Sequence, residues 1–287
     1  LTAHPYRNPI IGWMNDLENL RVEDTRDFYR HWYTPNNATL VVVGDVEPDE
    51  VLALAGKYFE AIPSRGLPER KPQDEPSQLG TKRVTVKAPA ELPYVLMTFR
   101  APALRDPERD WEPYALEMLA AVLDGNEAAR LTRTLVREER IASSADASYD
   151  SIARGPGFFY LSATPTPGRS AADVEQGLRR EMARIIEQGV SEEELDRVRA
   201  QAVAAHVFQR DSMFFQARQI ASLEAAGISH RTLDLQLKKL REVTPEQVRE
   251  VARKYFRDDF LTIATLDPQP LEGKRPAAPP AGLRHVQ

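Results

Sequence analysis

Two patterns of apolar residues alternate along the chain: one has the spacing of a helix and the other is typical of short strands. Residues 13–33 can place Phe28 and Trp32 on one helical face, and Pro35 then ends the helix because proline cannot continue it. The β-branched run "ATLVVVGDV" (38–46) comes next and predicts a buried strand. The chain is therefore expected to open with a helix followed by a strand.

The same two patterns predict the remaining elements. Helices are expected at 47–61, 111–123, 128–140, 170–189, 192–208, 212–226, 230–242 and from 244 onward. Strands are expected at 82–89, 92–102, 142–151, 157–167 and 260–267. Ser191 with Glu194 has the spacing of a capping box, and Thr244 before Pro245 is a typical helix start. Helices and strands in this order predict an α+β fold.

Residues 17–44 match residues 240–267 in the order of their features: an apolar helix face, an aromatic end, a polar break and a buried strand. Trp32 falls on Tyr255 in this alignment. We interpret the match as two copies of one α+β domain. The other interpretation is coincidence, because a helix followed by a strand is common in α+β proteins.

The repeat predicts a truncated first copy and a complete second copy. The expected parts are 1–66, the C-terminal remnant of a first domain; 67–81, a linker; 82–268, the second domain; and 269–287, a Pro-rich tail. Carrying the offset between the copies back to the start of the second copy predicts roughly 140 further residues ahead of Leu1.

Composition excludes several classes of function. The 287 residues carry a net charge of -5 without a basic stripe, which argues against a nucleic-acid partner. No apolar run approaches the length of a transmembrane helix. The absence of cysteine excludes disulfides, thiol catalysis and cysteine-ligated metals, and it is compatible with either the cytoplasm or the periplasm.

Catalytic motifs are absent from the sequence. The five histidines, His4, His31, His206, His230 and His285, form neither H-E-x-x-H nor H-x-x-E-H, and no nucleophile elbow, P-loop or dinucleotide fingerprint occurs. Single histidines without a partner at ligand spacing are expected to be structural. Runs of glutamate such as 192–194 are expected to be solvated helix charges. We therefore predict no catalytic residue and no metal ligand in this chain.

The stretch "HPYRNPIIGWMNDLENLRVEDTRDFYRHWYTPNNATLVVVGDV" resembles the end of the N-terminal domain in the pitrilysin/insulinase family of zinc metallopeptidases, in its bacterial branch similar to mitochondrial processing peptidases. "RLTRTLVREERIASSADASY" resembles the matching part of that family's second, catalytically inactive domain. The resemblance implies homologous, duplicated α+β domains, each a mixed or antiparallel sheet with helices packed on it, that enclose a chamber for peptide cleavage. It also implies an H-x-x-E-H zinc site early in the N-terminal domain, at positions that nothing in this sequence matches.

Many members of the family carry an arginine and a tyrosine in the second domain that hold the substrate near the zinc. Aligned on "LVREERIAS", these two positions hold Val136 and Ser143, neither of which supplies the required donor. Arg137 and Tyr149 lie nearby at the wrong spacing, and Arg137 is expected to be a solvated helix charge. The resemblance therefore implies no substrate-binding residue at the usual positions.

The resemblance implies the C-terminal part of a zinc-dependent metalloendopeptidase subunit that acts on peptides or unfolded protein segments. Zinc would belong to the intact protein, and whether that protein is an enzyme depends on an upstream H-x-x-E-H motif. The expected partner is a paralogous subunit carrying the Arg/Tyr pair, or a second copy of the chain. The alternatives are a non-catalytic structural or assembly subunit of the same family, and a module that binds peptides at a sheet edge. Bacterial relatives suggest a periplasmic location, with the cytoplasm as the alternative.

Overall fold

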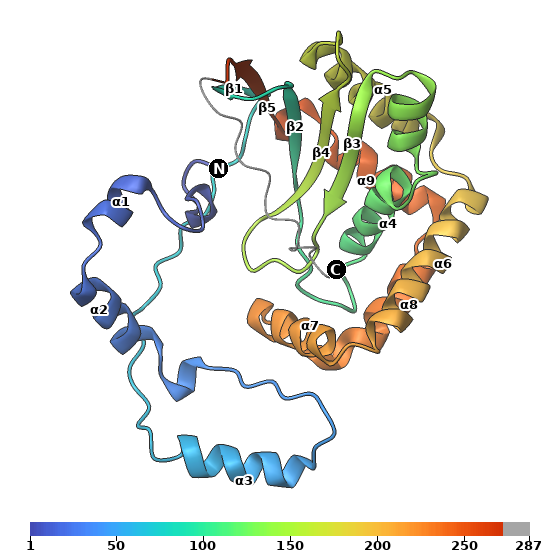
Figure 1. Cartoon of the computed structure of the whole chain (residues 1–287). Helices are drawn as coiled ribbons and strands as arrows, with labels where there is room; N and C mark the ends of the chain where they lie inside the picture. The colour runs from blue at the N-terminus through green and yellow to red at the C-terminus, as the bar shows by residue number, and fades with distance from the viewer. Residues whose placement is uncertain (272–287) are drawn as a thin grey trace. The chain divides into compact units, whose positions relative to one another are not determined.

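The structure is a computed structural model that describes residues 1–271. The chain divides into two compact units, one made of residues 1–77 with 202–234, and the other of residues 78–201 with the chain from 235 onward. Figure 1 shows the course of the chain through both. From residue 272 on, the predicted Pro-rich tail, and with it His285, lies outside the described residues.

A five-stranded sheet forms the centre of the unit that begins at residue 78. Its strands are β1 (Lys82–Pro89), β2 (Tyr94–Ala101), β3 (Ala142–Tyr149), β4 (Gly157–Pro165) and β5 (Leu261–Gln269), and their order in the sheet is β1-β5-β2-β4-β3. The β1–β5 pair is parallel, whereas β5–β2, β2–β4 and β4–β3 are antiparallel. The predicted mixed α+β fold is confirmed.

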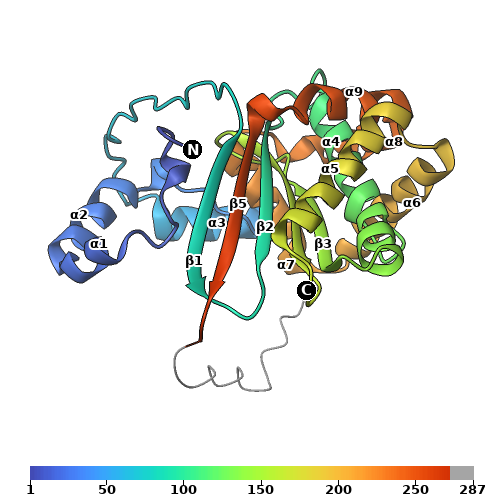
Figure 2. The ribbon, with the colours of Figure 1, turned by 90° about the horizontal axis from the view of Figure 1, so that it is seen from above.

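Three helices of this unit pack against one face of the sheet: α4 (Glu112–Asp124), α5 (Ala171–Gln188) and α9 (Pro245–Tyr255). In Figure 2 they lie together on one side of the sheet. The unit also contains parts of α6 (Glu192–Gln209) and α8 (Leu233–Glu242). Among the described residues of this unit, no helix covers the other face of the sheet.

The core lies between the sheet and these helices because alternate residues of each strand point to the same face. Val95, Met97 and Phe99 of β2 are fully buried, and Phe159 of β4 joins them. The ring of Phe256, just after α9, lies 5.0 Å from the rings of both Phe99 and Phe159. The apolar half of each strand thus forms a continuous core with the helices.

Side-chain caps fix where the helices begin. Ser170 and Asp173 form a complete capping box at α5, and Thr244 does the same at α9 with Pro245 in its first turn. The Oγ of Ser191 accepts a hydrogen bond from the N–H of Glu194, as the predicted spacing requires. These starts were predictable because capping is a local interaction.

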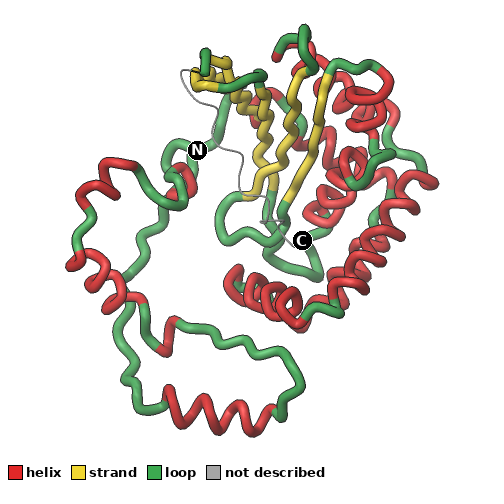
Figure 3. The backbone as a smooth tube through the Cα atoms, in the orientation of Figure 1, coloured by secondary structure: helices red, strands yellow, loops and turns green. Residues whose placement is uncertain are grey.

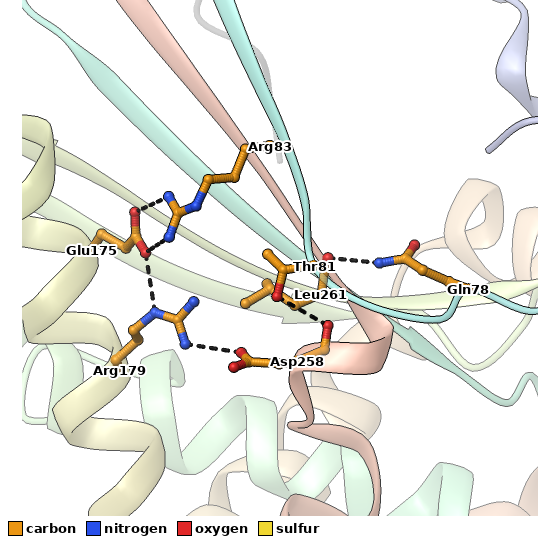
Figure 4. A network of polar contacts seen from close by, with 7 residues as sticks. All are labelled: Gln78, Thr81, Arg83, Glu175, Arg179, Asp258 and Leu261. Carbon is orange, nitrogen blue, oxygen red and sulfur yellow. Dashed lines mark hydrogen bonds and ion pairs between the residues drawn. The ribbon is translucent and has the colours of Figure 1, made fainter.

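A network of charged side chains holds the edge strand β1 in place (Figure 4). Arg83 of β1 donates two hydrogen bonds of 2.8 Å to Glu175 of α5, and this pairing lowers the pKa of Glu175. Arg179 bonds to Glu175 at 3.1 Å and also to Asp258 at 3.1 Å. On its inner side β1 pairs with β5, and no described strand lies along its outer edge. The contacts to α5 and to the chain just before β5 add to that pairing.

Two further hydrogen bonds anchor the approach to β1. The side chain of Gln78 donates to the carbonyl oxygen of Leu261 at 2.7 Å, and the hydroxyl of Thr81 donates to the carbonyl oxygen of Asp258 at 3.2 Å. Both bonds join the segment before β1 to the segment at the start of β5 (Figure 4). They therefore support the parallel register in which Lys82 lies opposite Thr262.

The unit of residues 1–77 and 202–234 is made of helices joined by long loops, and the structure shows no strand in it. It contains α1 (Met14–Asn19), α2 (Val22–Trp32), α3 (Pro48–Phe59) and α7 (Met213–Ala226). The single helix predicted for 13–33 is wrong, because Leu20 and Arg21 adopt extended backbone angles and separate α1 from α2. Within residues 1–271, no helix combines the length and apolarity that a bilayer crossing needs.

The buried strand predicted at 38–46 is also wrong. The segment belongs to no sheet, it is drawn as loop between the short helix Pro35–Asn37 and α3 in Figure 3, and Leu40 and Val42 are exposed. A β-branched run forms a strand only when a neighbouring strand takes up its backbone hydrogen bonds, and none of the described residues pairs with it. The duplication of an α+β domain and the predicted domain boundaries stay predictions.

Candidate functional site

The two family positions singled out in the sequence lie in neighbouring elements of the sheet-bearing unit. Val136 belongs to a π-helix, Thr132–Glu138, within the predicted helix 128–140. Ser143 is exposed in β3, and its hydroxyl donates to the carbonyl oxygen of Thr164 at 3.2 Å. A valine side chain offers no polar group, and the serine hydroxyl is held by the adjacent strand.

Arg137 and Tyr149 are engaged in local structure. Arg137 forms an exposed ion pair of 2.5 Å with Glu127. The hydroxyl of Tyr149 donates to the carbonyl oxygen of Pro102 at 2.5 Å, the ring stacks on Phe159, and burial raises its pKa above the ordinary range. Both side chains therefore make their contacts within the sheet-bearing unit.

The four described histidines each contact a neighbour in sequence. His4 accepts a hydrogen bond from the N–H of Tyr6, His31 bonds to the carbonyl oxygen of Asp27, His206 lies 3.0 Å from Arg210, and His230 pairs with Glu224. Among residues 1–271, no three His, Asp or Glu side chains come together as a metal ion would require. The donor set of this part of the chain does not fit a zinc site.

Glu117 is a titratable group that sequence reasoning missed. It lies in α4, accepts a hydrogen bond from the hydroxyl of buried Ser151, and has its pKa raised to about 7 chiefly by desolvation, with Asp150 adding to the effect. The sequence did not single it out, because one glutamate in an apolar helix belongs to no recognisable catalytic motif. A carboxyl group that titrates near neutrality is suited to proton transfer or to pH-dependent packing.

The turn between β3 and β4 that carries Ser151 is held on the chain before α4. The guanidinium of Arg105 donates to the carbonyl oxygens of Ala153 at 2.6 Å and Gly155 at 2.9 Å. The N–H of Leu104 donates to the carbonyl oxygen of Ser151 at 2.9 Å. These bonds fix Glu117 and Ser151 in a structured corner, which favours a packing role for the carboxyl group over a catalytic one.

The helix-free face of the sheet offers a surface for an extended ligand. By the strand register it carries Leu96 and Thr98 of β2, Tyr160 of β4 and Ser148 of β3, of which Tyr160 and Ser148 are exposed. Tyr160 lies between Thr98 and Ser148 in the register of the three strands. A mixture of apolar contact and hydrogen-bonding groups is suited to binding polypeptide without a strict sequence requirement.

The outer strands of the sheet are β1 and β3, so an added strand could pair only there. On β3, the carboxylate of Asp124 already accepts a hydrogen bond of 3.1 Å from the N–H of Ala147. Burial, with the nearby Asp146 and Glu127, raises the pKa of Asp124. One position of this edge is therefore covered by a side chain.

The unit of residues 1–77 and 202–234 contains an aromatic cavity of about 890 Å³. Phe28 and Trp32 of α2 line it together with Phe59 at the end of α3. Arg70 lies over the ring of Trp32, with its guanidinium carbon 4.9 Å from the ring centre, and Arg65 also lines the cavity. Such a concentration of exposed aromatic rings is typical of a surface that packs against further polypeptide.

Comparison with known proteins gives the following matches. The profile described as "Peptidase M16 inactive domain" matches residues 19–202. The zinc protease PqqE of Helicobacter pylori is 26% identical over 269 residues, which cover 92% of this chain and 59% of that protein. The chain thus spans somewhat more than half the length of the relative.

Two solved structures share the fold. A crystal structure of a protease from Helicobacter pylori has a TM-score of 0.86 and 24% identity, covering 93% of this chain and 64% of that one. The periplasmic protease PqqL from Escherichia coli has a TM-score of 0.72 and 18% identity, covering 90% of this chain and 30% of that one. Both matches extend over the helical unit and the sheet-bearing unit.

Proposed function

The chain belongs to the peptidase M16 family, through its inactive domain, and from this premise we propose that it is the C-terminal part of a zinc-dependent metalloendopeptidase subunit. The resemblance to the pitrilysin/insulinase peptidases is confirmed by this membership. The observation that carries the proposal is the profile match over residues 19–202, supported by the similarity to a zinc protease along most of the chain.

The part played by these residues is to form one wall of a chamber that holds peptides or unfolded segments. The helix-free face of the sheet supports this role, because it presents Tyr160, Ser148 and Thr98 on a rigid surface of hydrogen-bonded strands. A wall of this kind binds and orients an extended chain, which lowers the entropic cost of bringing a peptide bond to a catalytic group.

The zinc site is placed in the intact protein, outside the residues described here. This placement is supported by the poor fit of their donor set, since residues 1–271 bring no three metal-ligating side chains together. A zinc ion would there activate water and polarise the scissile carbonyl. The chain as given is then expected to be inactive by itself.

A partner subunit follows from the two substituted positions. Val136 and Ser143 lack the cationic and phenolic donors that family members use to hold substrate, so we propose that a paralogous subunit, or a second copy of the chain, supplies them. The exposed aromatic cavity around Phe28 and Trp32 supports contact with further polypeptide, including the proposed remainder of the first domain.

The experiment measures zinc and peptide cleavage separately. The purified 287-residue chain is assayed for metal by mass spectrometry and for turnover of a fluorogenic peptide library, and both are expected to be absent. Stoichiometric zinc with turnover would refute the placement of the site. The gene product that includes the upstream sequence is assayed in the same way, alone and with its paralogue.

The second candidate is a non-catalytic assembly subunit, favoured by the missing donors at Val136 and Ser143. It predicts that the longer gene product lacks H-x-x-E-H and that an assembly containing it loses integrity, not zinc, when it is deleted. For location we propose the periplasm, supported by the similarity to a periplasmic protease of Escherichia coli, and cell fractionation tests it.

A further inference from the structure

A cavity of about 580 Å³ lies in the sheet-bearing unit where the start of the π-helix, the end of α5 and the start of α6 meet. Its volume lies within the range of about 300–1,000 Å³ that is usual for ligand pockets. Four arginines line it: Arg130, Arg133, Arg184 and Arg197. The cavity lies on the helical side of the unit and has no part in the proposed peptide-binding face.

One of the four arginines is structural. Arg130 makes a two-pronged ion pair with Glu194, with distances of 2.8 and 2.6 Å, and both side chains are only 14% exposed. Its guanidinium also donates to the carbonyl oxygen of Gly189 at 3.0 Å. These contacts join the end of α5 to the start of α6, and they neutralise the charge of Glu194.

The other three arginines are about half exposed, and two of them have weak partners. Arg133 reaches Glu138 only at 4.0 Å, and Glu138 does not line the cavity. Arg197 lies 3.3 Å from Glu193, whose side chain is 87% exposed. An exposed ion pair of this kind contributes at most about 1 kcal/mol, so a ligand can replace its carboxylate at small cost.

The charges of the cavity favour an anion. Its carboxylates are Glu181, Glu193 and Glu194, against four guanidinium groups. Glu194 is taken up by Arg130, and Glu181 is buried beside Arg184 at 2.5 Å. One positive charge is left in excess: Arg133 forms no ion pair with a carboxylate of the lining, and Arg197 pairs only with the exposed Glu193, which a ligand can displace.

The two inner carboxylates of the cavity, Glu181 and Glu194, are influenced by the arginines around them. Burial raises the pKa of Glu181, against the opposing effect of Arg184, Arg130 and Arg133. For Glu194, burial acts upward, but the ion pair with Arg130 and the charge of Arg133 bring its pKa below the usual range. Arg133, carried on the π-helix, is thus one of the positive charges that line the cavity.

We propose that this cavity binds a polyphosphate, with Arg133 and Arg197 contacting its oxygens. Planar guanidinium groups bind phosphate oxygens through paired hydrogen bonds, and they keep their charge at all physiological pH values. A compact polyphosphate suits a cavity of this volume better than a stretch of polypeptide does. The site is independent of the proposed peptidase function.

Binding is measured with the full 287-residue chain at low ionic strength, using inorganic tripolyphosphate by calorimetry and a labelled hexaglutamate peptide by fluorescence anisotropy. Arg133→Gln with Arg197→Gln is expected to weaken binding at least about tenfold, because two charge-assisted contacts are lost. The matched control is Arg180→Gln, a half-exposed arginine of α5 that pairs with Glu139 outside the cavity and is expected to change affinity by less than about twofold.

Binding of tripolyphosphate with the expected pattern supports the proposal. The proposal is overturned if the wild-type chain does not bind tripolyphosphate or binds only the hexaglutamate peptide, if the double variant binds tripolyphosphate as well as wild type, or if Arg180→Gln loses as much affinity. Circular dichroism checks that the variants are folded. Should the double variant unfold, Arg197→Lys replaces it, and an unchanged affinity of that variant counts against the proposal.

Discussion

The carboxyl group of Glu117 makes a testable contribution to the pH dependence of stability. It lies in α4 beside Ser151, and desolvation raises its pKa from 4.5 to about 7. Since a tenfold change in an ionisation constant corresponds to about 1.4 kcal/mol, ionising this group in the folded state costs about 3 kcal/mol more than in the unfolded state. We use Glu117→Gln, which keeps the shape and the acceptor oxygen and removes the ionisation.

The sign follows from proton binding. Between pH 4.5 and about 7 the folded protein holds a proton on Glu117 that the unfolded chain has lost, so the free energy of unfolding of the wild type falls as the pH rises. The Glu117→Gln variant does not lose stability in this way, because glutamine does not ionise. Relative to wild type, the variant is therefore expected to gain stability between pH 5 and pH 8, by up to about 3 kcal/mol.

Urea unfolding at pH 5, 6, 7 and 8 measures this gain. The fluorescence of Trp111, which lies directly before α4, reports on the sheet-bearing unit when Trp13 and Trp32 are replaced by phenylalanine. Glu187→Gln, at an exposed position of α5, is the matched control and should follow the wild type at every pH. A stability difference for Glu117→Gln that stays constant or shrinks from pH 5 to pH 8 would refute the reasoning.

Three further substitutions test the packing of the same unit by urea unfolding or calorimetry. Gly157→Ala should lower the free energy of unfolding by about 1–3 kcal/mol, because the added Cβ would lie 2.7 Å from the carbonyl oxygen of Pro102. Gly66→Ala is the control and should be neutral, because its Cβ meets nothing within 4 Å. Equal effects of the two substitutions would contradict the contact at Gly157. Phe99→Ala should cost about 3–5 kcal/mol, since the ring is fully buried, and a loss below 1 kcal/mol would argue against this core. Arg130→Ala should lower the free energy of unfolding by about 3–5 kcal/mol, because it leaves the carboxylate of Glu194 unpaired. The double variant Arg130→Ala with Glu194→Ala should recover part of this loss, and no recovery would mean that the two side chains do not interact.

Much of the sheet-bearing unit was predictable from the sequence, because its signals are local. The helix expected at 111–123 is α4, Glu112–Asp124, and the strand expected at 260–267 is β5, Leu261–Gln269. Apolar spacing, capping residues and β-branched runs depend on interactions between residues a few positions apart. They were therefore sufficient to predict the elements that have packing partners in the described residues.

Other features depended on contacts that no local pattern encodes. The run 38–46 has strong strand propensity, yet Leu40 and Val42 remain exposed because no described strand pairs with it. The π-helix Thr132–Glu138 was expected as an ordinary helix, and the cavity with Arg133 and Arg197 joins residues about 60 positions apart. The raised pKa of Glu117 likewise comes from burial among distant segments.

Residue periodicity and long motifs such as "HWYTPNNATLVVVGDV" were enough to predict the α+β class, the family and most helices and strands. The strand order β1-β5-β2-β4-β3, the helix-free face of the sheet and the grouping of the arginines became visible only in the folded chain. The physical reason is that pairing, burial and electrostatic neighbourhood are properties of segments brought together by folding, whereas propensity and capping are properties of a short stretch of chain.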